Sequence, residues 1–196
     1  MEDLSRLSQG HTATSELSPA CSAVQQWVAE VVIGLNFCPF AHREVEKQRV
    51  VYRDSAAQTV EVALTDLASA MQELLENEHI ETTLLVLSKG FTDFEDYLDL
   101  LDYAQLTLRE FNLEGVLQIA SFHPDYQFAD TAADDVSNYT NRAPFPVLHL
   151  LREESLEKVL ARYPNPETIP ERNIEMADEQ GADYFRDLLQ RLQQRG

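Results

Sequence analysis

The sequence predicts an α/β domain with about four strands in a mainly parallel or mixed sheet, flanked by five helices. Apolar runs of strand length alternate along the chain with longer segments whose apolar residues recur at helical spacing. The order strand–helix–strand–helix–strand favours parallel pairing with right-handed crossovers. No linker rich in Gly, Ser or Pro divides the chain, so we expect residues 18–196 to form a single domain.

The N-terminal part of the chain predicts a tail followed by a helix. Residues 1–17 are polar and unpatterned, which is typical of a disordered tail. Ser18 followed by proline is typical of a helix N-cap and first helical position, and apolar residues at helical spacing continue to Leu35. Pro39 disfavours helical geometry in the residue before it, so we expect Cys38 on a turn just beyond the helix.

The rest of the chain alternates strands and helices. We expect strands at residues 49–53, 82–87, 117–122 and 145–151, two helices opened by capping boxes at Ser55 with Gln58 and at Thr92 with Glu95, a short helix at 155–163 and a last helix at about 170–194. The run at 82–87 is apolar on both faces, as in a central strand. Gly181 interrupts the last helix and predicts a kink or a close helix contact.

Charge and composition exclude several kinds of partner. Fifteen Lys and Arg residues against thirty-four Asp and Glu leave a formal charge of −19. This charge repels phosphate backbones and anionic lipids, so we expect neither nucleic acid nor membrane as a partner. The chain has no apolar run of spanning length and no secretory signal pattern. The chain has two cysteines, too few for a disulfide framework. This favours a protein of the reducing cytoplasm.

A long loop between the last two predicted strands is the first candidate site. It holds more than twenty residues without helical or strand periodicity. Loops of this length are usually functional or disordered, and the aromatic residues in this one provide apolar anchors that disordered segments lack. We interpret it as an ordered loop over a pocket. Asn138, Tyr139 and Arg142 offer orienting hydrogen bonds there, and the Arg142 guanidinium suits a carboxylate or phosphate.

Polar side chains at the predicted strand ends form a second group. Arg53, Lys89 and His123 follow three strands, and ligands of open parallel sheets bind beyond the carboxyl ends. These residues therefore predict a pocket for an anionic group, although the two cations can equally pair with surface acids. His149 lies inside the fourth strand, where it either fills the core or faces His123 across neighbouring strands. Either imidazole can act as an acid–base group or bind a metal.

Cys38 is the candidate nucleophile or metal ligand. It lies in the segment NFCPFAHR, next to His42 and Arg43, whose positive charges would favour the thiolate. The alternative is a small buried apolar residue, which is the commonest role of a free cysteine. Cys21 lies on the first helix, and we interpret it as structural.

Several familiar catalytic motifs are missing from the sequence. It contains no GxGxxG, GxxxxGK[ST], HExxH, GxSxG or CxxC. Dinucleotide and ATP chemistry of the common kinds, zincin proteolysis and thioredoxin-like exchange therefore lose support. The residues point to no particular cofactor.

Four separated segments resemble a known family. GLNFCPFA, SFHPDYQFAD, NYTNRAPFPVLHLLREES and IPERNIE, in this order, resemble the bacterial family catalogued as domain of unknown function 1415. The resemblance covers about residues 24–185 and implies a fold but no reaction. It places these residues at family motif positions: Asn36, Cys38, Pro39, His123, Pro124, Asn138, Arg142, Pro144 and His149. Asp130 and Ala143 stand where the family pattern has glycine and serine.

Three hypotheses for function follow. The first is an enzyme, a thiol- or histidine-dependent hydrolase or transferase, acting on a small anionic metabolite. Its catalytic residues would be Cys38, His123 and His149, and its substrate-binding residues Asn36, Arg53, Lys89, Asn138, Tyr139 and Arg142. The second is a metal- or haem-binding protein with Cys38, His123, His149 and Asp134 as ligands. The third is a module that binds an anion without turnover.

Overall fold

The computed structural model describes residues 16–195 and confirms an α/β fold with one four-stranded mixed sheet. The strands are β1 (Val50–Ser55), β2 (Thr82–Leu87), β3 (Leu117–Phe122) and β4 (Val147–Arg152), in the order β1-β2-β4-β3. β1 and β2 pair in parallel, whereas β4 is antiparallel to both β2 and β3. The antiparallel β4 makes the sheet mixed, and β1, β2 and β3 all run in the same direction.

The described residues form seven α-helices rather than the five expected. They are α1 (Pro19–Trp27), α2 (Ala41–Glu46), α3 (Val60–Glu76), α4 (Phe94–Glu110), α5 (Glu153–Leu160), α6 (Ile169–Gln180) and α7 (Ala182–Gln193), together with a π-helical segment η1 (Val28–Ile33) and 3₁₀ turns η2 (Val136–Thr140) and η3 (Pro166–Thr168). α2 was not predicted because it is one short segment without a buried residue. The predicted last helix is divided at Gly181, whose φ of 78° is easily reached only by glycine.

The helix N-termini confirm one predicted cap and correct two. The Ser18 hydroxyl accepts a hydrogen bond from the Cys21 N–H at 3.2 Å, as expected. α4 is capped by Asp93 rather than by Thr92, since the Asp93 carboxylate accepts from two backbone N–H groups at 2.9 and 3.3 Å. Ser55 ends β1 and caps no helix. Its hydroxyl donates to the carboxylate of Asp66 at 2.6 Å.

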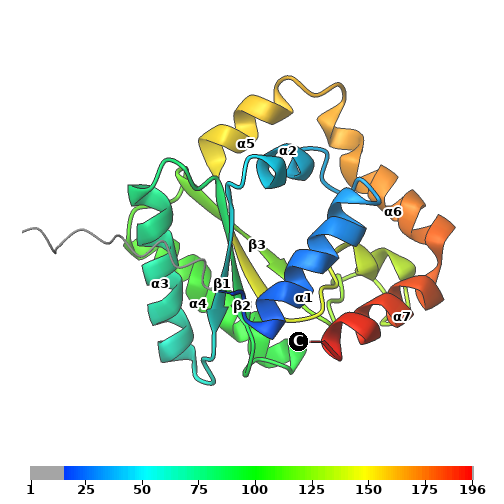
Figure 1. Cartoon of the computed structure of the whole chain (residues 1–196), viewed down its shortest axis with the longest axis horizontal. Coiled ribbons are helices and arrows are strands. Elements are labelled where there is room, and N and C mark those ends of the chain that lie inside the picture. The colour runs from blue at the N-terminus through cyan, green and yellow to red at the C-terminus, as the bar shows by residue number, and fades with distance from the viewer. Residues whose placement is uncertain (1–15, 196) are drawn as a thin grey trace, which may run out of the picture.

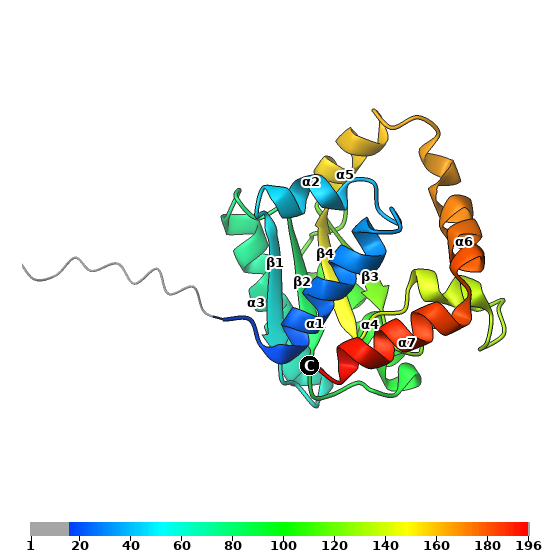
Figure 2. The same cartoon turned by 45° about the vertical axis from the view of Figure 1, so that its right-hand side comes forward.

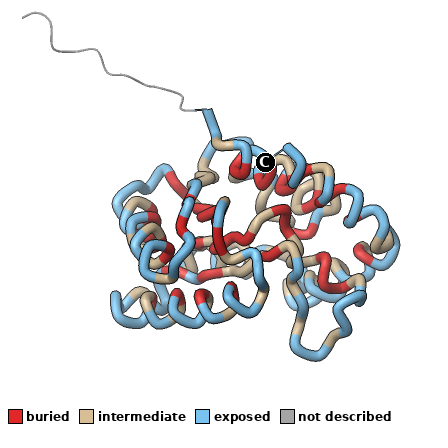
Figure 3. The backbone as a smooth tube through the Cα atoms, turned by 90° about the horizontal axis from the view of Figure 1, so that it is seen from below, coloured by how far each residue is buried: buried red, intermediate tan, exposed pale blue. Residues whose placement is uncertain are grey.

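Helices cover both faces of the sheet. α3 and α4 lie against one face, and α1 and α7 lie over the other (Figures 1 and 2). Alternation along β4 assigns its residues to the two faces: Leu148 and Leu150 pack with α3 and α4, whereas Val147 packs on the α1 side. All six residues of β2 are buried, as expected for a central strand. Figure 3 shows the buried segments gathered between the helix layers.

Two further sequence predictions concern the tail and the membrane. Residues 1–15 of the predicted tail lie outside the described residues, and the side chains of Glu16 and Leu17 are exposed. In the described part of the chain, no helix combines the length and apolar character that crossing a bilayer requires.

Candidate functional site

A cavity of about 270 Å³ lies on the α1 face of the sheet. Val50 and Thr82 line it at the amino ends of β1 and β2, and Leu151 lines it at the carboxyl end of β4. Trp27 and Val32 close it from α1 and η1. The cavity therefore lies toward the end of the sheet opposite to the one where the sequence predicted an anion pocket.

Helices α2 and α5 lie near each other at one end of the sheet (Figure 2), and both contribute residues to the lining of the cavity. Val45 of α2 and Leu156 and Val159 of α5 line it, yet neither helix contains a buried residue. Their apolar side chains thus point at a cavity and not at close-packed side chains. A helix normally gains its stability by burying its apolar face, so these two helices gain less from packing than the others.

Cys38 lies on the turn between η1 and α2 and lines the cavity, which confirms its predicted place beyond the first helix. Burial raises the pKa of its thiol, and the N–H groups of Phe40 and Ala41 offset this only in part. His42 and Arg43 do not stabilise the thiolate as expected, since both side chains are exposed and face Glu46 and Glu44 at 3.6 and 3.7 Å. The thiol is therefore neutral at pH 7.

Two side chains of α6 hold this turn in place. Arg172 donates to the carbonyl of Asn36 at 2.9 Å, and the Asn173 amide donates to the carbonyl of Phe37 at 2.8 Å. Asn36 itself has a φ of 56°, which asparagine tolerates better than most residues, and its side chain is exposed. Asn36 thus shapes the turn through its backbone. Sequence reasoning missed Arg172 and Asn173 as site residues, although the IPERNIE segment contains them.

His149 lines the cavity from β4. Its Nε2 atom lies 2.6 Å from the Thr82 hydroxyl, which in turn donates to the carbonyl of Leu150 at 2.6 Å. Burial lowers the pKa of His149 to about 4, so the imidazole is neutral at pH 7. Thr82 was not predicted as a site residue because it begins an otherwise apolar strand. Only the pairing of β2 with β4 shows that it reaches His149.

His123 lies on the opposite face of the sheet, which corrects the expectation that the two imidazoles face each other. The rings of Phe94 and Tyr97 in α4 lie 5.1 Å from its ring. Nε2 lies 3.0 Å from the carbonyl of Phe91, and Nδ1 accepts from the N–H of Asp125 at 3.0 Å. Burial lowers its pKa. The cause is the strand pleat: the residue opposite His149 is Ala120, and His123 follows Ala120 by three positions, an odd offset that places its side chain on the other face.

The polar residues of the long loop bind the loop itself. The Asn138 side chain accepts from the Phe128 N–H at 3.0 Å and donates to the Ala132 carbonyl at 2.8 Å. Arg142 donates to the carbonyls of Tyr126 and Ala133 at 3.0 and 2.8 Å, and its guanidinium lies 4.7 Å from the centre of the Tyr139 ring. The ordered loop was correctly predicted. However, Asn138, Tyr139 and Arg142 do not line the cavity.

The two cations predicted at the strand ends are also remote from the cavity. Arg53 points toward α3, where it pairs with Glu73, and Lys89 is exposed. Neither lines the cavity. The expected anion pocket formed by Arg53, Lys89 and His123 is therefore not assembled, because one side chain is paired, one is exposed and one is buried under α4.

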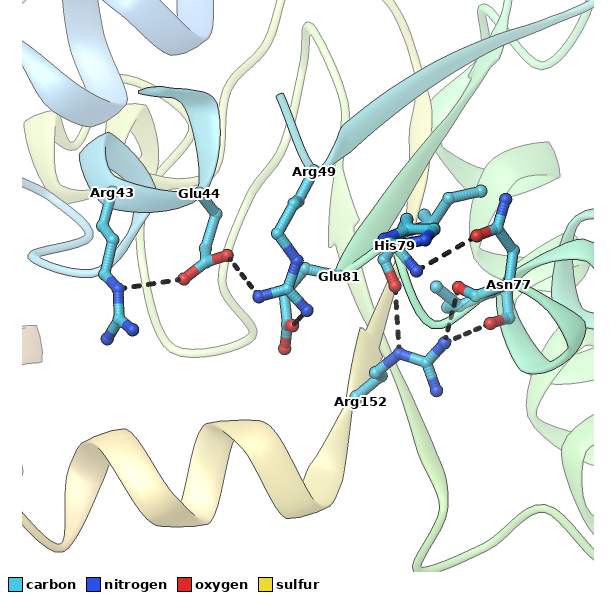
Figure 4. Close-up of polar contacts among 9 residues, drawn as sticks. Arg43, Glu44, Arg49, Asn77, His79, Glu81 and Arg152 are labelled. Atoms are coloured by element: carbon cyan, nitrogen blue, oxygen red, sulfur yellow. Dashed lines mark hydrogen bonds and ion pairs between the residues drawn. The ribbon is translucent and has the colours of Figure 1, made fainter. Parts of the chain in front are cut away.

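Charged side chains stand at the edge of the cavity near the start of β1 and β2 (Figure 4). Arg49 bridges the carboxylates of Glu44 and Glu81. Arg152 donates to the carbonyls of Ile80, Leu74 and Asn77. Among the described residues that line the cavity, Arg152 is the one cation, and its guanidinium is already occupied by these carbonyls.

The predicted metal ligands are not brought together. Cys38 and His149 line the cavity, whereas His123 lies across the sheet and Asp134 is exposed in the loop. Within residues 16–195, no three His, Cys, Asp or Glu side chains form a group able to hold a metal ion.

Comparison with known proteins places the chain in a family. A family model described as "Protein of unknown function (DUF1415)" matches residues 20–187. The match includes the Cys38 turn, His149 and the α6 residues that hold the turn. No curated protein and no solved structure matches the chain.

Proposed function

Since the chain belongs to the DUF1415 family, whose description specifies no activity, we propose a function from the cavity itself. The protein binds a small, uncharged and mainly apolar molecule between the sheet, η1, α2 and α5. The observation that carries this proposal is a cavity lined by apolar side chains under two helices that have no buried residue. A bound molecule would supply the packing that α2 and α5 lack.

The size and charge of the cavity limit the ligand. An engineered apolar cavity of roughly 150 Å³ holds benzene, so about 270 Å³ suits a molecule of roughly ten non-hydrogen atoms. An anion needs a cation or several N–H donors when it leaves water. Arg152 already donates to three carbonyls, and Glu44 and Glu81 add negative charge at the edge. These contacts favour a neutral ligand over the anionic metabolite expected from the sequence.

The single tryptophan allows a direct test of this proposal. Trp27 lines the cavity and is the one tryptophan of the chain, so its fluorescence should respond to a ligand there. We expect methylcyclohexane and cyclohexanol to change the Trp27 emission saturably and to raise the melting temperature. Cyclohexanecarboxylate, a similar ring with a negative charge, should bind at least about tenfold more weakly. Equal or tighter binding of the carboxylate contradicts the neutral-ligand proposal.

A matched pair of variants on β3 controls for binding elsewhere. Ala120 lines the cavity, whereas Gln118 lies on the same face of the same strand and is exposed. We expect Ala120→Phe to abolish the response to methylcyclohexane by filling the cavity, and Gln118→Phe to leave it unchanged. If Ala120→Phe folds and still binds the ligand with wild-type affinity, the cavity is not the binding site.

A second candidate function is a thiol-dependent enzyme, favoured by the fact that Cys38 and His149 line the same cavity. In this proposal the Cys38 sulfur forms a bond to an electrophilic carbon of the substrate and displaces a leaving group from that carbon, while His149 accepts the thiol proton and passes it to the leaving group. The free protein is not poised for this step. Its thiol and imidazole are both neutral, and no hydrogen bond joins them within the described residues. A substrate would have to bring the two groups together.

Alkylation by iodoacetamide separates the two candidates. Because burial raises the pKa of Cys38, we expect its alkylation rate to increase with pH. The pH at the midpoint of this increase should be higher than that of an ordinary thiol. Cys21 is buried as well, so the Cys38→Ser variant provides the background rate. A midpoint below that of an ordinary thiol would favour the enzyme.

A further inference from the structure

We propose that the ligand of this cavity carries a hydrogen-bond donor, in the form of a hydroxyl group, which binds Nδ1 of His149, and that Thr82 determines this preference by fixing the proton of the ring on Nε2. The inference rests on the proposed function and deepens it, because it defines the chemical class of the ligand. The ligand is thereby an alcohol or phenol and not a ketone, an ether or a hydrocarbon.

The position of the imidazole proton follows from two short contacts. The Thr82 oxygen lies 2.6 Å from the carbonyl oxygen of Leu150 and 2.6 Å from His149 Nε2. Two oxygens approach this closely only with a proton between them, and a carbonyl has none to give. The single hydroxyl proton of Thr82 therefore lies toward Leu150. The contact with His149 then needs the ring to donate, so Nε2 carries the proton and Nδ1 is an acceptor.

Nδ1 is left without a partner inside the protein. It makes no hydrogen bond among the described residues. The side-chain polar atoms of these residues that are both fully buried and without a partner are Trp27 Nε1, Thr83 Oγ1 and Asn173 Oδ1. Nδ1 of His149 is not one of them, so it keeps some accessible surface. His149 lies on an inner strand with neighbours on both sides, and its ring lines the cavity. The remaining accessible surface of Nδ1 therefore opens into the cavity.

The comparison with His123 shows how unusual this arrangement is within the molecule. Both nitrogens of His123 have backbone partners, at 3.0 Å each. An acceptor that faces an apolar cavity without a donor loses the hydrogen bond it makes in water. A ligand hydroxyl restores that bond. A carbonyl in the same place would set two acceptors against each other.

Cys38 contributes to the same preference. Its neutral thiol, on the η1–α2 turn, is a weak hydrogen-bond donor on a different wall of the cavity. A hydroxyl group can donate to Nδ1 and accept from a thiol, whereas an alkylamine is an ammonium ion at pH 7 and can only donate. This is the reason for specifying a hydroxyl.

Three rings of similar size test the inference through Trp27 fluorescence. They are cyclohexanol, cyclohexanone and methylcyclohexane. We expect cyclohexanol to bind about tenfold more tightly than cyclohexanone, the equivalent of one buried hydrogen bond made or lost. If cyclohexanone binds as tightly as cyclohexanol while methylcyclohexane saturates the signal, the donor requirement is wrong and the proposed function stands. If none of the three binds, the proposed function fails and the inference with it.

Variants at Thr82 test the cause of the preference. Thr82→Ser keeps the hydroxyl and should keep the preference for the alcohol. Thr82→Val keeps the shape but frees the ring to hold its proton on Nδ1, so the alcohol should lose its advantage over the ketone. An unchanged alcohol-to-ketone ratio in Thr82→Val overturns the role of Thr82.

Nitrogen-15 NMR of the unliganded wild-type protein reports the proton directly and depends on no variant. We expect the His149 ring to be the Nε2–H tautomer at pH 7, with Nδ1 at the chemical shift of an unprotonated nitrogen. The His149→Gln spectrum assigns the signal among the five histidines. A His149 ring protonated on Nδ1 overturns the inference.

Discussion

The two faces of the sheet are built from similar residues but are filled differently. On the α3–α4 face, Leu67, Leu74, Leu100 and Leu148 are fully buried and in contact in one cluster. On the α1 face, part of the volume is a cavity of about 270 Å³. Each face also holds one imidazole. Both nitrogens of His123 are bonded on the packed face, whereas only Nε2 of His149 is bonded on the cavity face.

This difference shows what marks a candidate site in this protein. His123 and the polar loop residues satisfy one another and the backbone, so they stabilise the fold. His149 and Cys38 lie where packing is incomplete, and there a ligand can still gain contacts. Four predictions test whether the two faces really differ in this way.

The largest difference should come from shortening leucines on opposite faces of β4. Leu148 is fully buried against α3 and α4, so Leu148→Ala should lower the free energy of unfolding by about 3–5 kcal/mol. Leu151 lines the existing cavity and is half-buried, so Leu151→Ala should lower it by less than about 2 kcal/mol. Urea denaturation measures both. Equal losses would mean that the two faces are packed alike.

Acid should destabilise the protein through His149. Its folded-state pKa is about 4 against an ordinary value of 6.5, so the unfolded chain takes up the proton first as the pH falls. Stability from this group is complete above about pH 6.5 and declines between pH 6.5 and 4, by up to about 3 kcal/mol. His149→Gln should flatten the stability profile in that range, measured by urea unfolding at each pH. If the stability profile of His149→Gln runs parallel to that of the wild type, the pKa of His149 is not lowered in the folded protein.

Enlarging an alanine on each face should give effects of different sign. Ala104 is fully buried in α4, so Ala104→Leu should destabilise the protein by about 1–3 kcal/mol through overpacking. Ala120→Leu extends into the cavity and should be neutral or stabilising by up to about 1 kcal/mol. Thermal melting of both variants provides the measurement. A large destabilisation by Ala120→Leu would show that the cavity cannot accept added atoms.

The smallest effect is expected for Arg53. Its ion pair with Glu73 is 38% and 42% exposed on the two side chains, and exposed pairs contribute little. Arg53→Ala should change the free energy of unfolding by less than about 0.5 kcal/mol and leave Trp27 fluorescence titrations unchanged. A loss of ligand affinity in this variant would restore Arg53 as a binding residue.

Most of the sheet was predictable from the sequence because each strand has a strong local signal. The runs at 82–87 and 117–122 coincide with β2 and β3, and Ser18 caps α1 as expected. The helix α2 was harder to predict because it lacks an apolar pattern. Gly181 was correctly identified as the interruption of the last helix, although the sequence did not show that two separate helices result.

The candidate site was only partly predictable, because it depends on which face each side chain occupies. The sequence places His123 and His149 on adjoining strands, but only the register shows that the pleat directs them to opposite faces. Cys38 was correctly located on its turn. Thr82 could not be found, since its contact with His149 joins residues far apart in the chain.

The strand order has a consequence for how the chain folds during synthesis. β4 is the last strand to leave the ribosome, yet it lies between β2 and β3. Until residues 147–152 emerge, β3 has no partner, and β2, all of whose residues are buried in the folded protein, has one open edge. Nascent chains expose such edges to aggregation, so protection by chaperones should matter most while the first 150 or so residues are being made.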